Sequence, residues 1–451
     1  MILWPIGFAL AVLTSSQSRV LTLDDAEAMA ATNAFSVRIA QLNLEKARLN
    51  TKVVEGQLGP SLSTQATYSR TENSGGGGGQ GGFNTSGDSK SIQLSLSQIV
   101  DISGEKRKLV QAARFQALSQ EAAILVELNV LRQAVRTKYF AALKAEELVR
   151  LQEATVASNR ERLEKARIRE QEGAIPKFDV LRLESEVKKS EKDLLDATAR
   201  LQIAKQDLNN TLGRPIETEF ELQRVTADPP VPADPTDPVQ VALANRQEIR
   251  QLDYAILALE RTRESYEKSQ LPTLTVGANH TQNLDPGAFR PNSTTVGQAV
   301  ISIPLFTSGV NQSRVKAAKS DEEVGKLQRE QLQLGIALEV RTALTQVRTA
   351  QEAIEVARAN EALAAEALRL ADLRYNEGAG ILLDVTVAQA ELTAARVAVL
   401  NAIDDFLNAY AALQRAVGRD QVTGGSASSG RIRGPRVGHR CPHATATASD
   451  A

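Results

Sequence analysis

Alternating apolar and polar positions mark two short segments in the first third of the chain. Ser61–Arg70 and Ser91–Val100 are equal in length, and in each the side chains alternate with a period of two. One face of the first segment carries Leu62, Thr64, Ala66 and Tyr68, and one face of the second carries Ile92, Leu94 and Leu96. A period of two is the side-chain period of a β-strand, so the pattern predicts a pair of strands.

Long segments free of helix breakers surround these strands. Asp24–Gln57 has no Pro and one late Gly, whereas Glu105–Glu172 and Asp179–Leu212 have neither residue. At 1.5 Å per residue, the longest of the three predicts a helix about 100 Å long. The two shorter segments are equal in length, and stacked end to end they match the long one. Helices of this length cannot wrap a globular core and need neighbouring helices to cover their apolar positions.

The whole pattern occurs twice. Glu172-Gly173-Ala174 and Asp179-Val180 recur at an offset of 205 as Glu377-Gly378-Ala379 and Asp384-Val385, whereas Pro60 recurs at an offset of 212 as Pro272. The offset changes by seven inside the interval that holds the glycine-rich stretch 75–82. We therefore expect the first unit to be the second unit with a glycine-rich loop inserted between its two strands.

This repeat defines the domain organisation. The apolar run Ile2–Leu13 is too short to span a bilayer as a helix and suits the core of a signal peptide, with a buried N-terminal helix as the alternative. The predicted parts are a signal peptide (1–18), a first repeat (19–227), an extended Pro-rich linker (228–238), a second repeat (239–418) and a disordered tail (419–451).

No apolar stretch after residue 18 reaches the length that a transmembrane helix requires. If the chain crosses a membrane, it must do so with strands. Four strands cannot enclose a lumen, because the narrowest membrane barrels use about eight. Closure must then involve several copies of the chain, and a pore wide enough for cargo favours three copies over two.

Composition and charge exclude other classes of protein. The 53 Lys and Arg nearly balance the 54 Asp and Glu, which gives no reason to expect nucleic-acid binding. The single cysteine, Cys441, excludes a disulfide framework, and together with His439 and His443 it lies in the Ser/Gly/Ala/Thr-rich tail, where a metal site is not expected. No nucleophile, general-base pair, metal site or cofactor motif is recognisable, so we expect no enzyme activity.

Taken in order, the repeated unit, the strand that starts at Pro60, the Ser103-Gly104 before the long helix and the Gly-x-x-x-x-x-Asp-Val turns resemble the TolC-like outer-membrane efflux proteins. The resemblance covers roughly Leu21–Gly418. It implies a homotrimer with a 12-stranded β-barrel in the lipid of the outer membrane of a Gram-negative-type bacterium, continued by an α-helical barrel across the periplasm. It also implies an equatorial collar built from the linker and the C-terminal segment, and places the loop 75–82 outside the cell.

The family's partners follow from the same resemblance. Such a duct receives substrates from a periplasmic adaptor and an inner-membrane pump of the RND, ABC or MFS type, as in efflux or type I secretion, and conducts them passively. The alternative from another class is a periplasmic coiled-coil adaptor or structural protein without a barrel. The cargo is not specified by the sequence.

Three carboxylate or phenol side chains match the family's closure machinery. Asp384 matches the position of an acidic ring at the periplasmic constriction, where three copies would attract cations; the second ring of TolC falls on Val387 here. Asp179 and Tyr375 match partners in the network that holds the tips closed, through a hydrogen bond of about 1 kcal/mol. The competing interpretations are helix N-caps for both aspartates and simple packing for Tyr375.

The turns between the helices match the family's adaptor-docking tips. Their residues are small or apolar: Gly173, Ala174, Ile175, Gly378, Ala379, Gly380 and Ile381. Small residues let a partner approach the backbone closely, although Gly173 and Gly378 are equally suited to ending the preceding helix. Gly380 occupies the position of an Arg in the TolC closure network, so that part of the network is absent or rebuilt.

Overall fold

The computed structural model of the chain describes residues 20–71, 87–223, 237–285 and 291–418, all of them inside one compact unit, Met1–Arg419. Four predicted features lie wholly or mostly outside the described residues: the signal peptide 1–18, the glycine-rich loop 75–82, the linker 228–238 and the tail 419–451.

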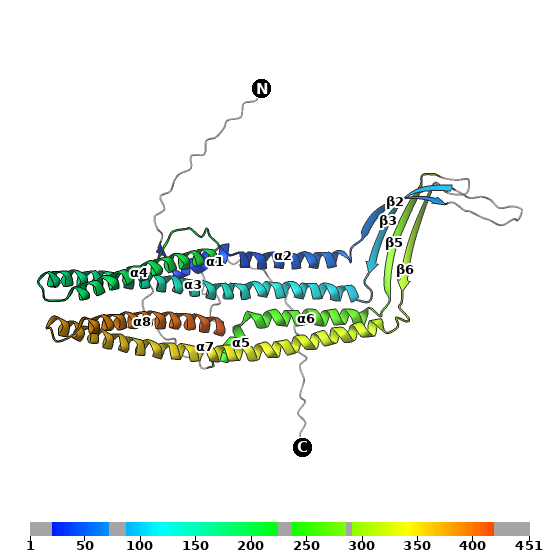
Figure 1. The fold of residues 1–451 in the computed structure, drawn as a ribbon. Helices are drawn as coiled ribbons and strands as arrows, with labels where there is room; N and C mark the ends of the chain where they lie inside the picture. Colours follow the sequence, from blue (N-terminus) through cyan, green and yellow to red (C-terminus); the bar gives the residue numbers. More distant parts are fainter. Residues whose placement is uncertain (1–19, 72–86, 224–236, 286–290, 419–451) are drawn as a thin grey trace, which may run out of the picture. The chain divides into compact units, whose positions relative to one another are not determined.

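The described residues form two repeats of the same order of elements, as predicted (Figure 1). Each repeat has a short helix, a longer helix, two strands, a helix of 67 residues and a final helix. The first contains β1 (Val20–Leu21), α1 (Leu23–Asn33), α2 (Phe35–Gly56), β2 (Ser61–Thr71), β3 (Gly87–Val100), α3 (Glu105–Gln171), α4 (Lys177–Thr211) and β4 (Glu221–Leu222). The second contains α5 (Pro238–Asn245), α6 (Gln247–Lys268), β5 (Thr273–Asn283), β6 (Ser293–Ser302), α7 (Val310–Asn376) and α8 (Leu382–Val417).

The predicted helix over Asp24–Gln57 is in fact two helices, α1 and α2, which are separated by an extended residue, Ala34 (φ −62°, ψ 133°). The cause is tertiary. Gly213, at the end of α4, comes so close that a Cβ atom there would lie 2.6 Å from the carbonyl oxygen of Asn33. The second repeat breaks at the equivalent residue, Arg246, where a Cβ atom at Gly418 would lie 3.2 Å from the Cβ of Asn245, a less close approach. The absence of Pro and Gly near Ala34 could not reveal this break, because the neighbour that causes it lies far away in the sequence.

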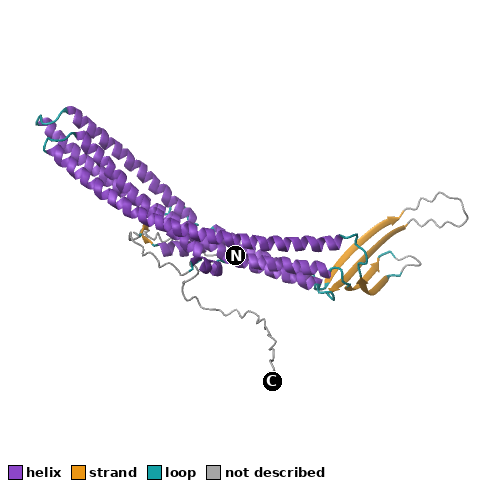
Figure 2. Ribbon diagram, turned by 90° about the horizontal axis from the view of Figure 1, so that it is seen from below, coloured by secondary structure: helices purple, strands orange, loops and turns teal. Residues whose placement is uncertain are grey.

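Strands β2, β3, β5 and β6 form a four-stranded antiparallel sheet with the order β2-β3-β5-β6, shown in Figure 2 at one end of the long helices. The central pair, β3 and β5, joins the two repeats. The outer strands, β2 and β6, have no second strand partner among the described residues. The sheet is therefore open at both edges.

The helices of the two repeats, like the strands, meet through one inner element of each repeat. Near the sheet they lie in the order α2–α3–α6–α7, and near the tips in the order α4–α3–α8–α7. No helix among the described residues is long and apolar enough to cross a membrane.

A buried cluster surrounds Tyr139 near the middle of α3. Tyr139 of α3 is fully buried, and its hydroxyl lies 2.9 Å from the carbonyl oxygen of Leu21 and 3.1 Å from that of Gln223. These two residues end or follow the short parallel pair β1–β4. Tyr139 therefore ties both ends of the first repeat to its long helix.

Candidate functional site

The two tip turns have the same backbone structure. Gly173 (φ +75°) and Gly378 (φ +74°) adopt the left-handed conformation directly after α3 and α7. In each turn the amide of the Gly donates to a carbonyl three residues earlier, and the next amide, of Ala174 or Ala379, donates to one five residues earlier. This pair of bonds is the Schellman motif. Both glycines therefore end their helices, which confirms that interpretation and leaves adaptor docking a prediction.

Neither aspartate of the tips is a helix cap. The N-cap residues are Pro176 for α4 and Ile381 for α8, and no side chain caps either helix. Asp179 and Asp384 are each the third residue of their helix, in the first turn, where the helix dipole favours a negative charge. Asp179 is half-buried and Asp384 is exposed. The N-cap interpretation of these residues is wrong, and a role at the channel mouth stays a prediction.

Tyr375 connects the tips of the two repeats. Its ring packs against one apolar cluster that includes Leu183 and Leu382 and against a second that includes Leu368. The guanidinium carbon of Arg169 lies 5.8 Å from the centre of the ring, a cation–π distance. A packing role for Tyr375 is thus confirmed.

The hydroxyl of Tyr375 is buried and has no hydrogen-bond partner among the described residues. Burial raises the pKa of Tyr375 above its usual value, the charge of Asp179 raises it further, and Arg169 opposes the shift. The Tyr375–Asp179 hydrogen bond predicted from the resemblance is therefore not formed, although Asp179 is close enough to act on the phenol electrostatically.

Two polar contacts across the repeats were not found by sequence reasoning. The guanidinium of Arg162 on α3 lies 3.1 Å from the carboxylate of Asp372 on α7, and Arg169 donates to the side-chain oxygen of Asn376 at 3.1 Å. Charged residues are common along both long helices, so nothing in the sequence singles out these four. Only the packing of the α3–α4 hairpin against the α7–α8 hairpin brings them together.

Gly380 has a structural reason to be glycine. A Cβ atom at this position would lie 3.1 Å from the Cβ of Arg374 and 3.3 Å from the amide nitrogen of Tyr375. Any side chain at this position would therefore have to displace its neighbours in the tip turn after α7 slightly. The contacts from Arg162 and Arg169 instead link the hairpins from the α3 side.

The predicted docking residues differ in exposure. Gly173, Ala174, Gly378, Ala379 and Ile381 are exposed. Ile175 is half-buried and packs against the tip cluster around Leu183. The exposed apolar side chain of the first tip is Phe178, 68% exposed, and its counterpart in the second tip is Leu383, 41% exposed. The sequence could have indicated Phe178, because this apolar residue is the second residue of the helix that follows the tip turn.

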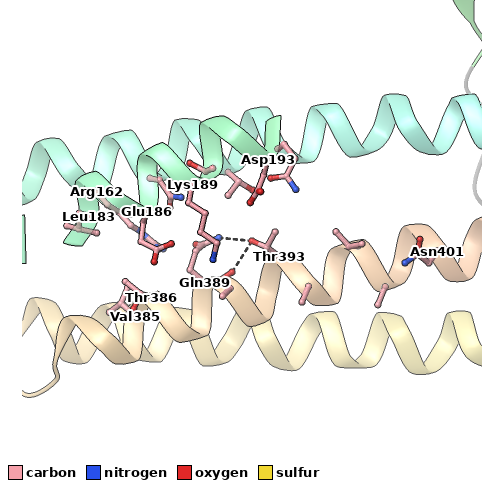
Figure 3. Close-up of a pocket in the computed structure, with 18 residues that line it drawn as sticks. Arg162, Leu183, Glu186, Lys189, Asp193, Val385, Thr386, Gln389, Thr393 and Asn401 are labelled. Atoms are coloured by element: carbon pink, nitrogen blue, oxygen red, sulfur yellow. Dashed lines mark hydrogen bonds between the residues drawn. The ribbon is translucent and has the colours of Figure 1, made fainter. Parts of the chain in front are cut away.

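A groove of about 430 Å³ lies behind the tips, between the α3–α4 hairpin and α8 (Figure 3). Figure 3 shows Glu186, Lys189 and Asp193 of α4 on one side, and Gln389 and Thr393 of α8 on the other. Gln389 and Thr393 bond to each other along α8. The lining mixes polar and charged side chains with Leu, Val and Ala. No group of three or more His, Cys, Asp or Glu side chains that could hold a metal is found within the described ranges.

The family model for outer membrane efflux proteins matches residues 28–214 and 239–419, which include both repeats and both tips. The chain belongs to the outer membrane efflux protein family. Nodulation protein T of Rhizobium leguminosarum bv. trifolii is 23% identical over 343 residues, 72% of this chain and 71% of that protein. The outer membrane efflux protein BepC of Brucella suis biovar 1 is 25% identical over 334 residues, 73% of this chain and 72% of that protein.

Solved structures of this efflux family share the fold. The crystal structure of CusC superposes with a TM-score of 0.77 at 19% identity, and the match covers 90% of this chain and 95% of CusC. At this identity the likeness shows the fold alone. It confirms the predicted fold class, in which long helical hairpins and a four-stranded β domain come from two tandem repeats.

Proposed function

We propose that the chain is one protomer of a homotrimeric channel in the outer membrane, through which an adaptor and an inner-membrane pump export substrates. The observation that carries this proposal is that one chain forms an incomplete wall. Its sheet ends in the unpaired strands β2 and β6, and its helical layer ends in α2 and α7 near the sheet and in α4 and α7 near the tips.

Open strand edges are not tolerated in lipid, so the sheet needs further strands from other copies. Three copies supply 12 strands, enough for a barrel with a lumen. The same three copies would place six long hairpins around one axis, which makes the helical part a tube that continues the barrel. The fold thus favours a passive duct, in which transport energy comes from the pump.

The tips are the proposed site of closure and docking. Asp179 and Asp384 would bring six carboxylates to the periplasmic mouth of a trimer, where they attract cations and oppose tight closure. The contacts Arg162–Asp372 and Arg169–Asn376 hold the two hairpins of one chain together. The exposed Phe178 and Ile381 beside small turn residues offer an adaptor apolar anchors close to accessible backbone.

Planar-bilayer recording of the purified protein tests this function. A trimer that is extracted with the outer-membrane fraction and conducts ions across the bilayer is the expected result. A monomer that dissolves with inner-membrane or periplasmic proteins and forms no channels would support the adaptor alternative. The type of pump, RND, ABC or MFS, follows from which pump co-purifies after crosslinking in cells.

A further inference from the structure

The two faces of the sheet β2-β3-β5-β6 differ in chemistry. Residues paired across neighbouring strands lie on the same face, so the register assigns each strand residue to one of the two faces. One of them, here called the leucine face, holds all the leucines of these strands: Leu62, Leu94, Leu96 and Leu274. The other, here called the hydroxyl face, consists mainly of Ser and Thr, and none of its side chains in the four strands is charged.

The leucine face is the one that suits contact with lipid. In a membrane barrel, apolar side chains face the lipid and polar side chains face the lumen. His280 and Thr295 also lie on the leucine face, but their Nδ1 and Oγ1 atoms are 2.9 Å apart, so each side chain gives the other a hydrogen-bond partner. The hydroxyl face is then left to line the lumen of the proposed channel.

The leucine face has the height of the apolar layer of a membrane. From Val100, at the end of β3 next to the helices, to Lys90, near the loop end, the strand rises about 33 Å at about 3.3 Å per residue. At the usual strand tilt of about 40°, this length covers about 25 Å of depth, which is the height of the apolar band in membrane barrels. Lys90 therefore lies at the boundary between the hydrocarbon and the headgroups.

The charged side chains of the four strands gather at this boundary. Arg70 pairs with Asp88, and the neighbouring pair on the leucine face is Tyr68–Lys90. The Nε of Arg70 lies 4.0 Å from a carboxylate oxygen of Asp88, so these two charges offset each other. Lys90 is exposed and forms no ion pair within the described residues. These four residues, here called the rim cluster, thus carry one net positive charge, that of Lys90.

The second repeat has no such cluster. The equivalent residue pairs, found with the sequence offsets of 212 and 205, are His280–Thr295 and Gln282–Ser293. Neither pair contains Lys, Arg, Asp or Glu. The rim cluster therefore belongs to the first repeat alone, and a trimer would have three copies of it.

We propose that the rim cluster binds the phosphate headgroup of an anionic lipid in the outer leaflet, with the ammonium of Lys90 as the cation. This inference rests on the proposed channel and names a class of lipid that surrounds it. The stem of a lysine packs along apolar surface while its ammonium reaches the headgroups, where it attracts anionic lipids. Tyr68 is 59% exposed, as expected of an aromatic residue at the same level. The helix α3 follows the opposite end of β3, so the rim cluster faces the leaflet remote from the periplasm.

Lipid titration tests this site in the full-length trimer. The protein is purified in an uncharged detergent, and native mass spectrometry follows the binding of diphosphorylated lipid A and of dephosphorylated lipid A. Up to three diphosphorylated molecules should bind to each trimer, and the dephosphorylated form should bind more weakly. Lys90→Gln should weaken binding of the diphosphorylated form about fivefold, the effect of one lysine near an anionic lipid surface, whereas Lys90→Arg should retain it.

A matched control moves the lysine to the other face of the sheet. The double variant Lys90→Ser, Ser91→Lys keeps the net charge and nearly the same depth, but it puts the ammonium on the hydroxyl face. It should bind the lipid as weakly as Lys90→Gln does. Lys90→Gln itself should conduct ions like the wild type, because Lys90 lies outside the lumen.

Three results would overturn the lipid site: equal binding of the two forms of lipid A, wild-type binding by the double variant, or displacement of the lipid by inorganic phosphate alone. The channel function would stand in each case, because conductance of the wild-type trimer is measured separately. If the wild-type protein forms neither trimers nor channels, the channel function fails, and the lipid site fails with it.

Discussion

The contact between Arg162 and Asp372 gives the sharpest prediction about closure. It joins α3 of the first repeat to α7 of the second near the tips, so it must break when the two hairpins of a chain separate. The Arg162 side chain is 21% exposed and that of Asp372 is 38% exposed, which makes the pair partly shielded from water. We expect Arg162→Ala to favour the open channel.

The size of the effect follows from the number of copies. A partly exposed ion pair contributes about 0.5–1 kcal/mol, so three copies stabilise the closed state by about 1.5–3 kcal/mol. That energy corresponds to about 10- to 150-fold in the ratio of closed to open channels. Single-channel recording measures this ratio directly. The double variant Arg162→Ala, Asp372→Ala should open the channel no more than either single variant, because both remove the same contact.

Arg160 supplies a matched control two residues away on the same helix. It pairs with Glu191 at 2.6 Å inside the α3–α4 hairpin, so it does not connect the repeats. Arg160→Ala removes the same charge near the same mouth and should leave the open fraction unchanged. Equal opening by Arg160→Ala and Arg162→Ala would show that net charge, and not the bridge between hairpins, controls closure.

The same structure supports four further predictions. Asp384→Ala should leave trimer assembly intact and lower cation selectivity in bilayer recordings; unchanged selectivity would remove Asp384 from the pore. Tyr375→Phe should change the free energy of unfolding by less than about 0.5 kcal/mol, because the buried hydroxyl has no hydrogen-bond partner to lose among the described residues. A large loss of stability would show that the hydroxyl has a hydrogen-bond partner in the assembled trimer. Gly213→Ala should destabilise the fold by well over about 1 kcal/mol, because the new Cβ would meet the Asn33 carbonyl oxygen at 2.6 Å. Gly173→Ala, with open space and a similar φ, should cost only about 1 kcal/mol; equal melting shifts would contradict the close approach. Burial raises the pKa of Tyr139 to about 12. The free energy of unfolding should therefore be constant well below pH 10, where the folded and the unfolded chain both hold the proton, and should fall by up to about 3 kcal/mol as the pH rises toward 12. Alkaline melting curves of Tyr139→Phe should lack this fall.

Much of the fold was predictable because its signals are local. The strands were visible as a period of two, and the absence of Gly and Pro from Glu105 to Glu172 predicted a helix that the structure places at Glu105–Gln171. The offsets of 205 and 212 showed two copies of one unit. The Gly-x-x-x-x-x-Asp-Val turns located both tips, since a left-handed glycine ends a helix wherever the chain is otherwise helical.

The predictions that were wrong or missing concern contacts between residues distant in the sequence. The helix breaks at Ala34 because the backbone of Gly213 lies close to Asn33 and Ala34, although alanine is itself the best helix former. Tyr375 lies near Asp179 without bonding to it, and Arg162 meets Asp372 only because the α3–α4 and α7–α8 hairpins pack together. A periodic sequence determines which residues share a helix face, because that depends on the backbone alone. Which residues meet across two faces depends on how the helices pack, and here that was decided by the tertiary structure.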